Sequence, residues 1–154
     1  MIRLPHIFIS PGHNFFGHHG KPAGKSPLLE VSAIECVAGR GLRGDRFFDN
    51  KPDYKGQVTL FAAEIFLALC RALQLAPPSP SVLRRNLITE GADLATLIGH
   101  RFTLQDIELE GVEECRPCYW MNQAVGPGAE EWLRGRGGLR CRILTNGWLQ
   151  QDAP

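Results

Sequence analysis

The chain has 154 residues, of which 44% are hydrophobic and 21% are charged, and its formal net charge is +1. These values are typical of a single soluble globular domain, and they give no overall basic charge of the kind that binds nucleic acid. No run of about 18 apolar residues predicts a membrane span, and the short apolar N-terminus lacks the features of a secretion signal, so we expect a cytoplasmic protein.

The N-terminal part predicts a strand at residues 7–10 and then a glycine- and proline-rich loop over residues 11–22. Three histidines fall in this loop, at His13, His18 and His19. No cysteine or carboxylate follows closely enough in sequence to complete a ligand set. A surface loop is therefore favoured over a dedicated metal site.

Residues 29–37 alternate imperfectly between apolar and polar side chains, which predicts a strand with a bulge. Residues 38–46 follow, with three glycines and three arginines. Their spacing is neither a dinucleotide fingerprint nor a P-loop. Two interpretations of this segment stay open, an anion-facing loop and a turn closed by an Asp–Arg pair.

Residues 57–61 predict a short strand, and residues 62–75 predict the clearest helix of the chain, with one apolar face and a stop at Pro77. Further along, Arg84, Arg85 and Asn86 directly precede an apolar, strand-like pair. An arginine fork matches phosphate or carboxylate groups, and an amide can contact a heterocycle. Taken alone, surface arginines at the start of an edge strand are the simpler interpretation.

The C-terminal half predicts short elements separated by glycines. They are a helical turn at 92–100, a strand with a tight bend at 105–106, a short helix at 127–133 and a strand at 139–144. Asn146-Gly147 is a strong hairpin signal. Many short strands, frequent turns and one good helix predict a mainly β fold, built as a closed or nearly closed β-barrel with a few peripheral α-helices.

Two of the five cysteines, Cys115 and Cys118, are separated by Arg116 and Pro117. Proline disfavours a helix here, and the arginine is a cation that favours a thiolate. Half a zinc site and an exchanging dithiol are two alternatives, but no second cysteine or histidine pair completes the first. A single exposed thiolate beside cationic groups, acting as a soft-metal ligand or sulfur nucleophile, fits best. The other three cysteines are predicted to occupy core positions.

An ordered set of short motifs resembles the MOSC domain family, whose members occur fused to molybdenum cofactor sulfurases, in amidoxime-reducing proteins and as small stand-alone bacterial proteins. The resemblance runs from about residue 13 to about residue 150. The motifs are Arg43-Gly44-Asp45-Arg46, Lys55-Gly56-Gln57-Val58, Arg84-Arg85-Asn86-Leu87, Gly91, Leu97-Ile98-Gly99 and Pro117-Cys118.

This resemblance implies a mostly β barrel that binds a pterin-based molybdenum cofactor (molybdopterin) or handles its sulfur. It places Cys118 as the catalytic residue, the molybdenum ligand or the sulfur-carrying thiol. The residues that fall where cofactor contacts cluster in the family are Lys55, Arg84, Arg85 and Asn86. Arg43 and Asp45 match the glycine-rich turn of the family, where they contact the cofactor or shape its pocket.

Three functions stay open for this chain. The favoured one is reduction of N-hydroxylated compounds at a molybdenum held by Cys118, with electrons from an external donor. The second is a sulfur carrier in which Cys118 holds a persulfide received from a pyridoxal-phosphate cysteine desulfurase. The third is a non-catalytic barrel that binds a small anionic metabolite or a partner protein. Cys115 is an additional cysteine, and a reversible disulfide with Cys118 would silence the latter.

Overall fold

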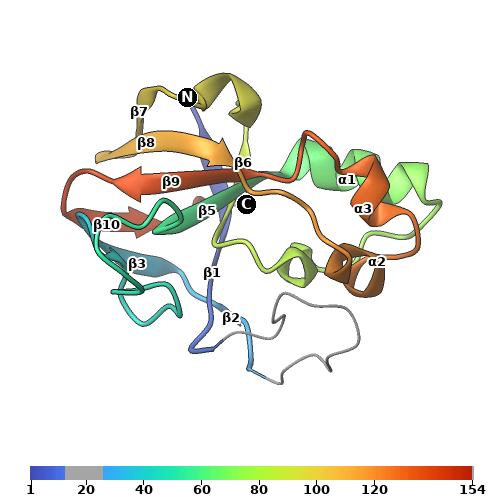
Figure 1. Ribbon diagram of the computed structural model, residues 1–154, viewed down its shortest axis with the longest axis horizontal. Helices are drawn as coiled ribbons and strands as arrows, with labels where there is room; N and C mark the ends of the chain where they lie inside the picture. Colours follow the sequence, from blue (N-terminus) through green and yellow to red (C-terminus); the bar gives the residue numbers. More distant parts are fainter. Residues whose placement is uncertain (13–25, 154) are drawn as a thin grey trace.

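The computed structural model describes residues 1–12 and 26–153, which form a mainly β fold with three α-helices (Figure 1). The histidines of the predicted loop, His13, His18 and His19, lie outside the described residues. In the part of the chain that is described, no helix is both long and apolar enough to cross a membrane.

The described elements are short, as the many glycines and prolines predict. The strands are β1 (Arg3–Ile9), β2 (Leu29–Glu30), β3 (Ala33–Val37), β4 (Gly41–Leu42), β5 (Val58–Ala62), β6 (Leu87–Glu90), β7 (Arg101–Leu104), β8 (Ile107–Glu114), β9 (Leu139–Ile143) and β10 (Gly147–Gln150). The α-helices are α1 (Ala63–Ala72), α2 (Trp120–Ala124) and α3 (Ala129–Trp132), and two 3₁₀ helices are η1 (Pro80–Leu83) and η2 (Leu94–Leu97).

The strands form two sheets. The larger has seven strands in the order β2-β1-β6-β5-β9-β8-β7, and the smaller has three in the order β10-β3-β4. Strands β5 and β6 run parallel, and the other pairs within the named strands are antiparallel. Neither sheet closes on itself among the described residues, so the predicted barrel is not confirmed, whereas the mainly β class is.

Two sequence predictions are corrected by this topology. The single strand predicted over residues 29–37 is two strands, because β2 pairs with β1 in the larger sheet and β3 pairs with β10 and β4 in the smaller one. The imperfect alternation of apolar and polar side chains falls where the chain passes from the larger sheet to the smaller one. The hairpin predicted at Asn146-Gly147 is wrong, since β9 pairs with β5 and β8 while β10 pairs with β3. The Asn146 side chain instead accepts a hydrogen bond from the Ala38 backbone amide at 2.8 Å.

The larger sheet has an apolar core on each face because strand side chains alternate. Leu60 and Leu87 point into the core that includes the smaller sheet, whereas Phe61 and Ile88 point toward the helices. Phe66 and the neighbouring buried residues of α1 cover this second face, as its amphipathic pattern predicts. In Figure 1 the three α-helices lie together at one end of the larger sheet, on the right of the view.

Candidate functional site: an arginine-lined cavity with an exposed thiol

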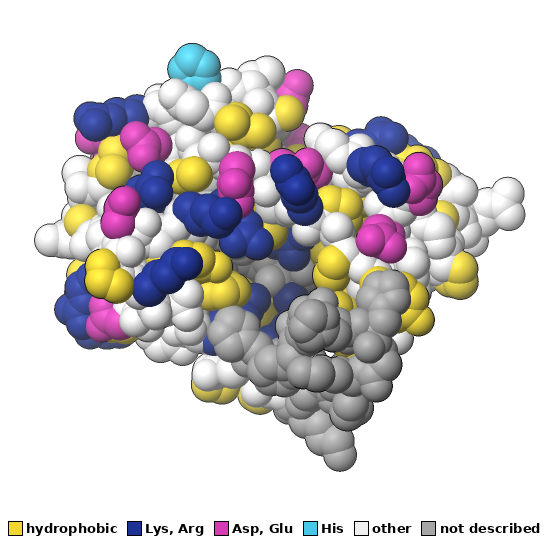
Figure 2. All heavy atoms as spheres, in the orientation of Figure 1, with side chains coloured by type: hydrophobic (Ala, Val, Ile, Leu, Met, Phe, Trp, Pro, Cys, Tyr) yellow, Lys and Arg dark blue, Asp and Glu magenta, His cyan; other side chains and the backbone are white. Residues whose placement is uncertain are grey.

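A cavity of about 190 Å³ opens where β5, the end of β8 and the start of β9 meet η1 and α2. We call it the arginine cavity. Figure 2 shows Lys and Arg side chains gathered around a hollow in the middle of this face. The lining residues are Arg46, Phe47, Tyr54, Gly56, Thr59, Val82, Leu83, Arg84, Arg85, Cys115, Arg116, Cys118, Trp120, Met121, Ala124 and Arg140. Among these described residues five are arginines and none is Asp or Glu.

The cysteine segment reaches the cavity directly from β8. The Cys115 amide donates to the Gly138 carbonyl at 2.8 Å, and the Arg85 guanidinium donates to the Cys115 carbonyl at 3.2 Å and to the Gly137 carbonyl at 3.0 Å. A side chain on Gly137 would place its Cβ 2.4 Å from the Cys115 carbonyl oxygen and 2.7 Å from the Pro117 ring. Arg85 and a bare backbone at Gly137 therefore fix the course of this segment.

The five cysteines differ in exposure, and Cys118 alone is exposed, whereas Cys36, Cys70, Cys115 and Cys141 are buried. Burial, together with the Glu35 carboxylate, raises the pKa of the Cys36 thiol to about 12, and burial also raises the pKa of Cys141. These two thiols stay protonated at neutral pH. The sequence prediction that Cys36, Cys70 and Cys141 occupy core positions is confirmed.

Cys115 and Cys118 line the same cavity, and neither is in a disulfide. Cys115 is buried, whereas Cys118 is exposed. The Cys115 backbone is held on both sides, by the Gly138 carbonyl at its amide and by Arg85 at its carbonyl. The reversible disulfide between the two cysteines stays a prediction.

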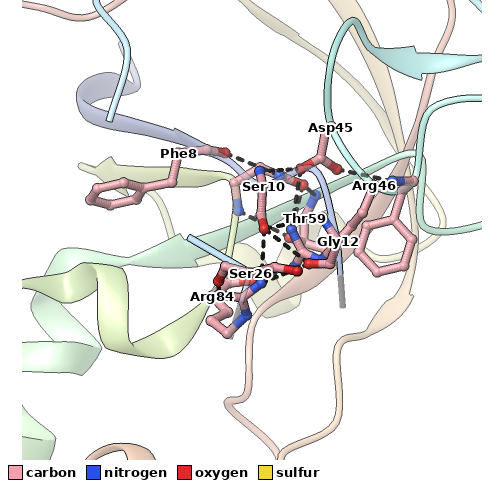
Figure 3. A network of polar contacts seen from close by, with 10 residues as sticks. Phe8, Ser10, Gly12, Ser26, Asp45, Arg46, Thr59 and Arg84 are labelled. Atoms are coloured by element: carbon pink, nitrogen blue, oxygen red, sulfur yellow. Dashed lines mark hydrogen bonds and ion pairs between the residues drawn. The ribbon is translucent and has the colours of Figure 1, made fainter. Parts of the chain in front are cut away.

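Arg46 and Arg84 are held in place by a network that starts at a buried carboxylate (Figure 3). Asp45, whose side chain is fully buried, accepts hydrogen bonds from the Ser10 amide at 3.0 Å and the Arg46 guanidinium at 3.1 Å. Arg46 then donates to the Arg84 carbonyl at 2.9 Å, and Arg84 donates to the Ser10 hydroxyl at 3.0 Å. Two alternatives were predicted for residues 38–46, an anion-facing loop and a turn closed by an Asp–Arg pair. Asp45 and Arg46 form the predicted pair, and Arg46 also lines the cavity.

Arg140, on β9, occupies the opposite wall. Its guanidinium donates to the Tyr54 hydroxyl at 3.3 Å and lies 3.9 Å from the Glu113 carboxylate. Burial opposes its charge, but the Cys115 sulfur, Tyr54 and Glu113 together raise the Arg140 pKa. Its Nε atom, which is the atom nearest to Glu113, is buried and has no hydrogen-bond partner among the described residues. Arg140 therefore adds a positive charge to this wall of the cavity.

The clustered positive charges disfavour one another. Burial, and then the neighbouring Arg46 charge, lowers the pKa of Arg84 to about 10. Burial also lowers the pKa of Arg46, and Arg85 adds to the effect despite the partial compensation from Asp45. Both groups remain cationic at neutral pH. An anion placed among them would relieve this repulsion, so the charge of the arginine cavity suits anionic ligands.

Some of the site residues predicted from the sequence line the cavity, and others do not. Cys118, Arg84 and Arg85 line the cavity together. Lys55, between the lining residues Tyr54 and Gly56, forms an ion pair with Glu113 at 2.8 Å. Asn86 is fully buried and bonds to Thr59 and the Phe8 carbonyl, and Arg43 is exposed and bonds to Glu35 at 2.6 Å. The structure does not bring Asn86 or Arg43 to the cavity surface.

Sequence reasoning missed Arg46, Tyr54 and Arg140 as cavity residues. Arg140 alternates with apolar residues on β9 and reads as an ordinary outward-facing residue, because strand alternation cannot say what the other face covers. Arg46 is the last residue of the Arg43-Gly44-Asp45-Arg46 motif, so its signal was present in the sequence. In residues 1–12 and 26–153 no group of three or more His, Cys, Asp and Glu side chains is placed to hold a metal ion.

The geometry therefore defines the class of protein. It is a mainly β domain with an exposed cysteine in an arginine-lined cavity. The MOSC domain family profile matches residues 18–154. This match covers most of the chain, so the protein belongs to the MOSC domain family, which is associated with molybdenum cofactor binding. No curated protein sequence matches the chain.

Solved structures share the fold at low sequence identity. The YUAD protein from Bacillus subtilis superposes with a TM-score of 0.75 at 16% identity, covering 98% of this chain and 92% of its own. YiiM from Geobacillus stearothermophilus gives 0.67 at 13% identity, with coverages of 100% and 73%. YiiM from Escherichia coli gives 0.66 at 18% identity, with coverages of 99% and 67%. At these identities the likeness concerns the fold.

Proposed function

We propose that this MOSC domain binds the molybdenum cofactor in the arginine cavity, with the Cys118 thiolate as the molybdenum ligand. The observation that carries the proposal is the exposed Cys118 in a cavity lined by five arginines and no carboxylate. A thiolate is a soft ligand, and arginine forks match the phosphate of the cofactor. The favoured activity is reduction of N-hydroxylated compounds.

The donor set fits the cofactor chemically. Arg46, Arg84 and Arg140 line the cavity, and protein contacts orient their guanidinium groups. Their positive charges suit the phosphate of the cofactor. The volume of about 190 Å³ is below the about 300 Å³ at which drug-sized pockets begin. The cavity would therefore enclose the anionic part of so large a ligand.

Each residue has a defined task in this proposal. Cys118 would hold the metal, Arg46, Arg84 and Arg140 would bind the anionic groups, and Arg85 would keep the cysteine segment in place through its carbonyl contacts. The bound cofactor would supply two-electron redox chemistry. None of the described lining residues is Asp, Glu or His, so this part of the cavity offers no carboxylate or imidazole for proton transfer. Electrons would come from an external donor.

The test is to produce the protein in cofactor-competent cells and measure bound molybdenum and pterin per chain. The parent protein should carry both, and Cys118→Ser should lose the metal. Cys115→Ser is the matched control, since it removes a thiol from the same cavity and should retain the metal. Folded parent protein without molybdenum, or equal metal content in both variants, would contradict the proposal.

A second candidate function is a sulfur carrier, favoured by the exposure of Cys118 beside four buried cysteines. A Cys118 thiolate would accept one sulfur atom from the enzyme-bound persulfide of a pyridoxal-phosphate cysteine desulfurase, and the desulfurase cysteine would leave as a thiolate. Intact-mass spectrometry after incubation with desulfurase and cysteine should show one added sulfur in the parent and in Cys115→Ser. Its presence in Cys118→Ser, or its absence from the parent, would remove this candidate.

A further inference from the structure

A second, larger cavity of about 410 Å³ lies on the other side of the cysteine segment. It runs between η2, the start of α1 and the loop that leads from α3 into β9, which pass close to one another in Figure 1. We call it the acidic cavity. Its apolar lining comes from Ala62, Ile65, Ala92, Leu94, Ala95 and Ile98. Its volume falls within the about 300–1,000 Å³ typical of small-molecule sites.

Three carboxylates line this cavity, from Glu64, Asp93 and Glu114, against the single cation of Arg136. Each carboxylate has a hydrogen bond from a backbone amide, namely Gly91 to Glu64 at 2.7 Å, Ala95 to Asp93 at 3.2 Å and Gly137 to Glu114 at 3.0 Å. Within the described residues none of the three forms an ion pair.

Arg136 does not neutralise the three carboxylates. Its guanidinium lies 3.9 Å from the centre of the Trp132 ring, and its Nε donates to the Trp132 carbonyl at 2.9 Å. The first turn of α1 adds a weak positive potential, which the Glu64 carboxylate in that turn offsets. The cavity therefore has an apolar lining and a net negative charge, with one oxygen of each carboxylate available to a donor.

The two cavities have opposite charges because they lie on opposite sides of one strand end. Successive side chains of a strand point to opposite faces, and Glu114 lines the acidic cavity whereas Cys115 lines the arginine cavity. The same backbone closes both, since Gly137 donates to Glu114 and its carbonyl accepts from Arg85.

We propose that the acidic cavity binds a small organic cation, an amine with an aliphatic or aromatic body. The apolar side chains would cover the body, and the ammonium group would lie in the negative potential of Glu64, Asp93 and Glu114 and donate to one of these carboxylates. The proposal does not depend on the molybdenum cofactor, because it rests on residues outside the arginine cavity.

The test compares three probes of similar size by calorimetry and by amide shifts in nuclear magnetic resonance spectra. They are 2-phenylethylamine, the neutral 2-phenylethanol and the anionic 3-phenylpropanoate. The amine should bind, shift the amides of Gly91, Ala92, Ala95 and Gly138, and exceed the alcohol by about tenfold, the effect of one charge-assisted hydrogen bond. Equal binding of amine and alcohol, preference for the carboxylate, or no saturable binding of the amine would overturn the proposal.

Single-residue variants then test which carboxylate charges contribute to amine binding. Glu64→Gln and Glu114→Gln keep an acceptor for the backbone amide but remove the charge, so each should weaken amine binding by up to about tenfold and leave alcohol binding unchanged. Glu108→Gln is the matched control, because its carboxylate faces Arg101 at 3.9 Å and does not line the cavity. Unchanged amine affinity in both cavity variants would also contradict the proposal. If either variant unfolds, the probe comparison on the parent protein decides.

Discussion

At Cys36 and Cys141 the protein keeps thiols in places where a thiolate cannot be hydrated. Both side chains are buried in the core between the two sheets. Burial raises the Cys36 pKa to about 12, with a further contribution from Glu35, and also raises the Cys141 pKa. In the unfolded chain a thiol titrates near pH 8.5. As pH rises above that value, the unfolded chain loses these protons and the folded protein keeps them.

This difference predicts alkaline destabilisation. The folded pKa is raised, so the contribution is fully present below about pH 8.5 and is lost as pH rises toward about 12. The free energy of unfolding should fall by up to about 1.4 kcal/mol per pH unit for each buried thiol. Urea unfolding between about pH 8 and about pH 10.5 measures the slope. Cys36→Ala should reduce it, and Cys118→Ser should not. An unchanged slope in Cys36→Ala would refute the explanation.

Among the cavity residues, chemical type was easier to predict than position. Cys118, Arg84 and Arg85 were predicted because their motifs combine a soft sulfur or planar cations with neighbouring residues in the sequence. Arg140 can be recognised as a site residue only from the pairing of β9 with β8, because this pairing brings its side chain near Cys115. The separation of Glu114 and Cys115 into cavities of opposite charge also depends on which face of β8 each residue occupies. Such relations arise from pairing between distant strands.

At the scale of elements, the loop between α3 and β9 controls both cavities. Gly137 is buried, and its Cβ position would fall 2.4 Å from the Cys115 carbonyl oxygen. Gly135, in the same loop, has φ 83° and no atom within 4 Å of its Cβ position. The two glycines are therefore required for different reasons, the first for close approach of two backbones and the second for conformation.

Alanine at these positions should separate the two requirements. Gly137→Ala should destabilise the fold by about 2–3 kcal/mol through overpacking and displace residues 115–118. Gly135→Ala should cost about 1 kcal/mol because of its left-handed backbone and leave that segment unchanged. Hydrogen exchange of the Cys115 amide, which bonds to Gly138, should accelerate in Gly137→Ala alone. Equal acceleration in both variants would show that the close contact at Gly137 is not what holds the cysteine segment.

Element types were predicted well where the signal is local. The helical turn predicted within residues 92–100 is η2, and Asp93 caps it by accepting from the Ala95 amide. The bend predicted at residues 105–106 is the tight turn between β7 and β8, with Gln105 at φ 53°. The predicted barrel and the hairpin at Asn146-Gly147 required knowledge of which strands pair. Periodicity carries no such information, because the same alternation suits an edge, a centre or a second sheet.

At the scale of the whole molecule, Asn86 joins three strands of the larger sheet that are distant in sequence. It directly precedes β6 and is fully buried. Its side-chain oxygen accepts from the Thr59 amide at 3.0 Å and the Thr59 hydroxyl at 3.1 Å, and its nitrogen donates to the Phe8 carbonyl at 3.1 Å. These bonds connect β6 to β5 and to β1. We infer that Asn86 stabilises the sheet that carries Arg84 and Arg85.

Asn86→Ala should therefore lower the free energy of unfolding by about 3 kcal/mol or more, because it leaves the buried Thr59 amide and Phe8 carbonyl without their partner. Urea unfolding of the apoprotein measures this effect, and Asn50→Ala, at an exposed asparagine, is the control. The alternative prediction, direct contact with the cofactor, has a different signature: normal apoprotein stability with reduced molybdenum content. Because Asn86 is fully buried and both polar atoms of its side chain are already bonded, we expect stability to fall, and any Asn86→Ala protein that remains folded should bind molybdenum as the parent does.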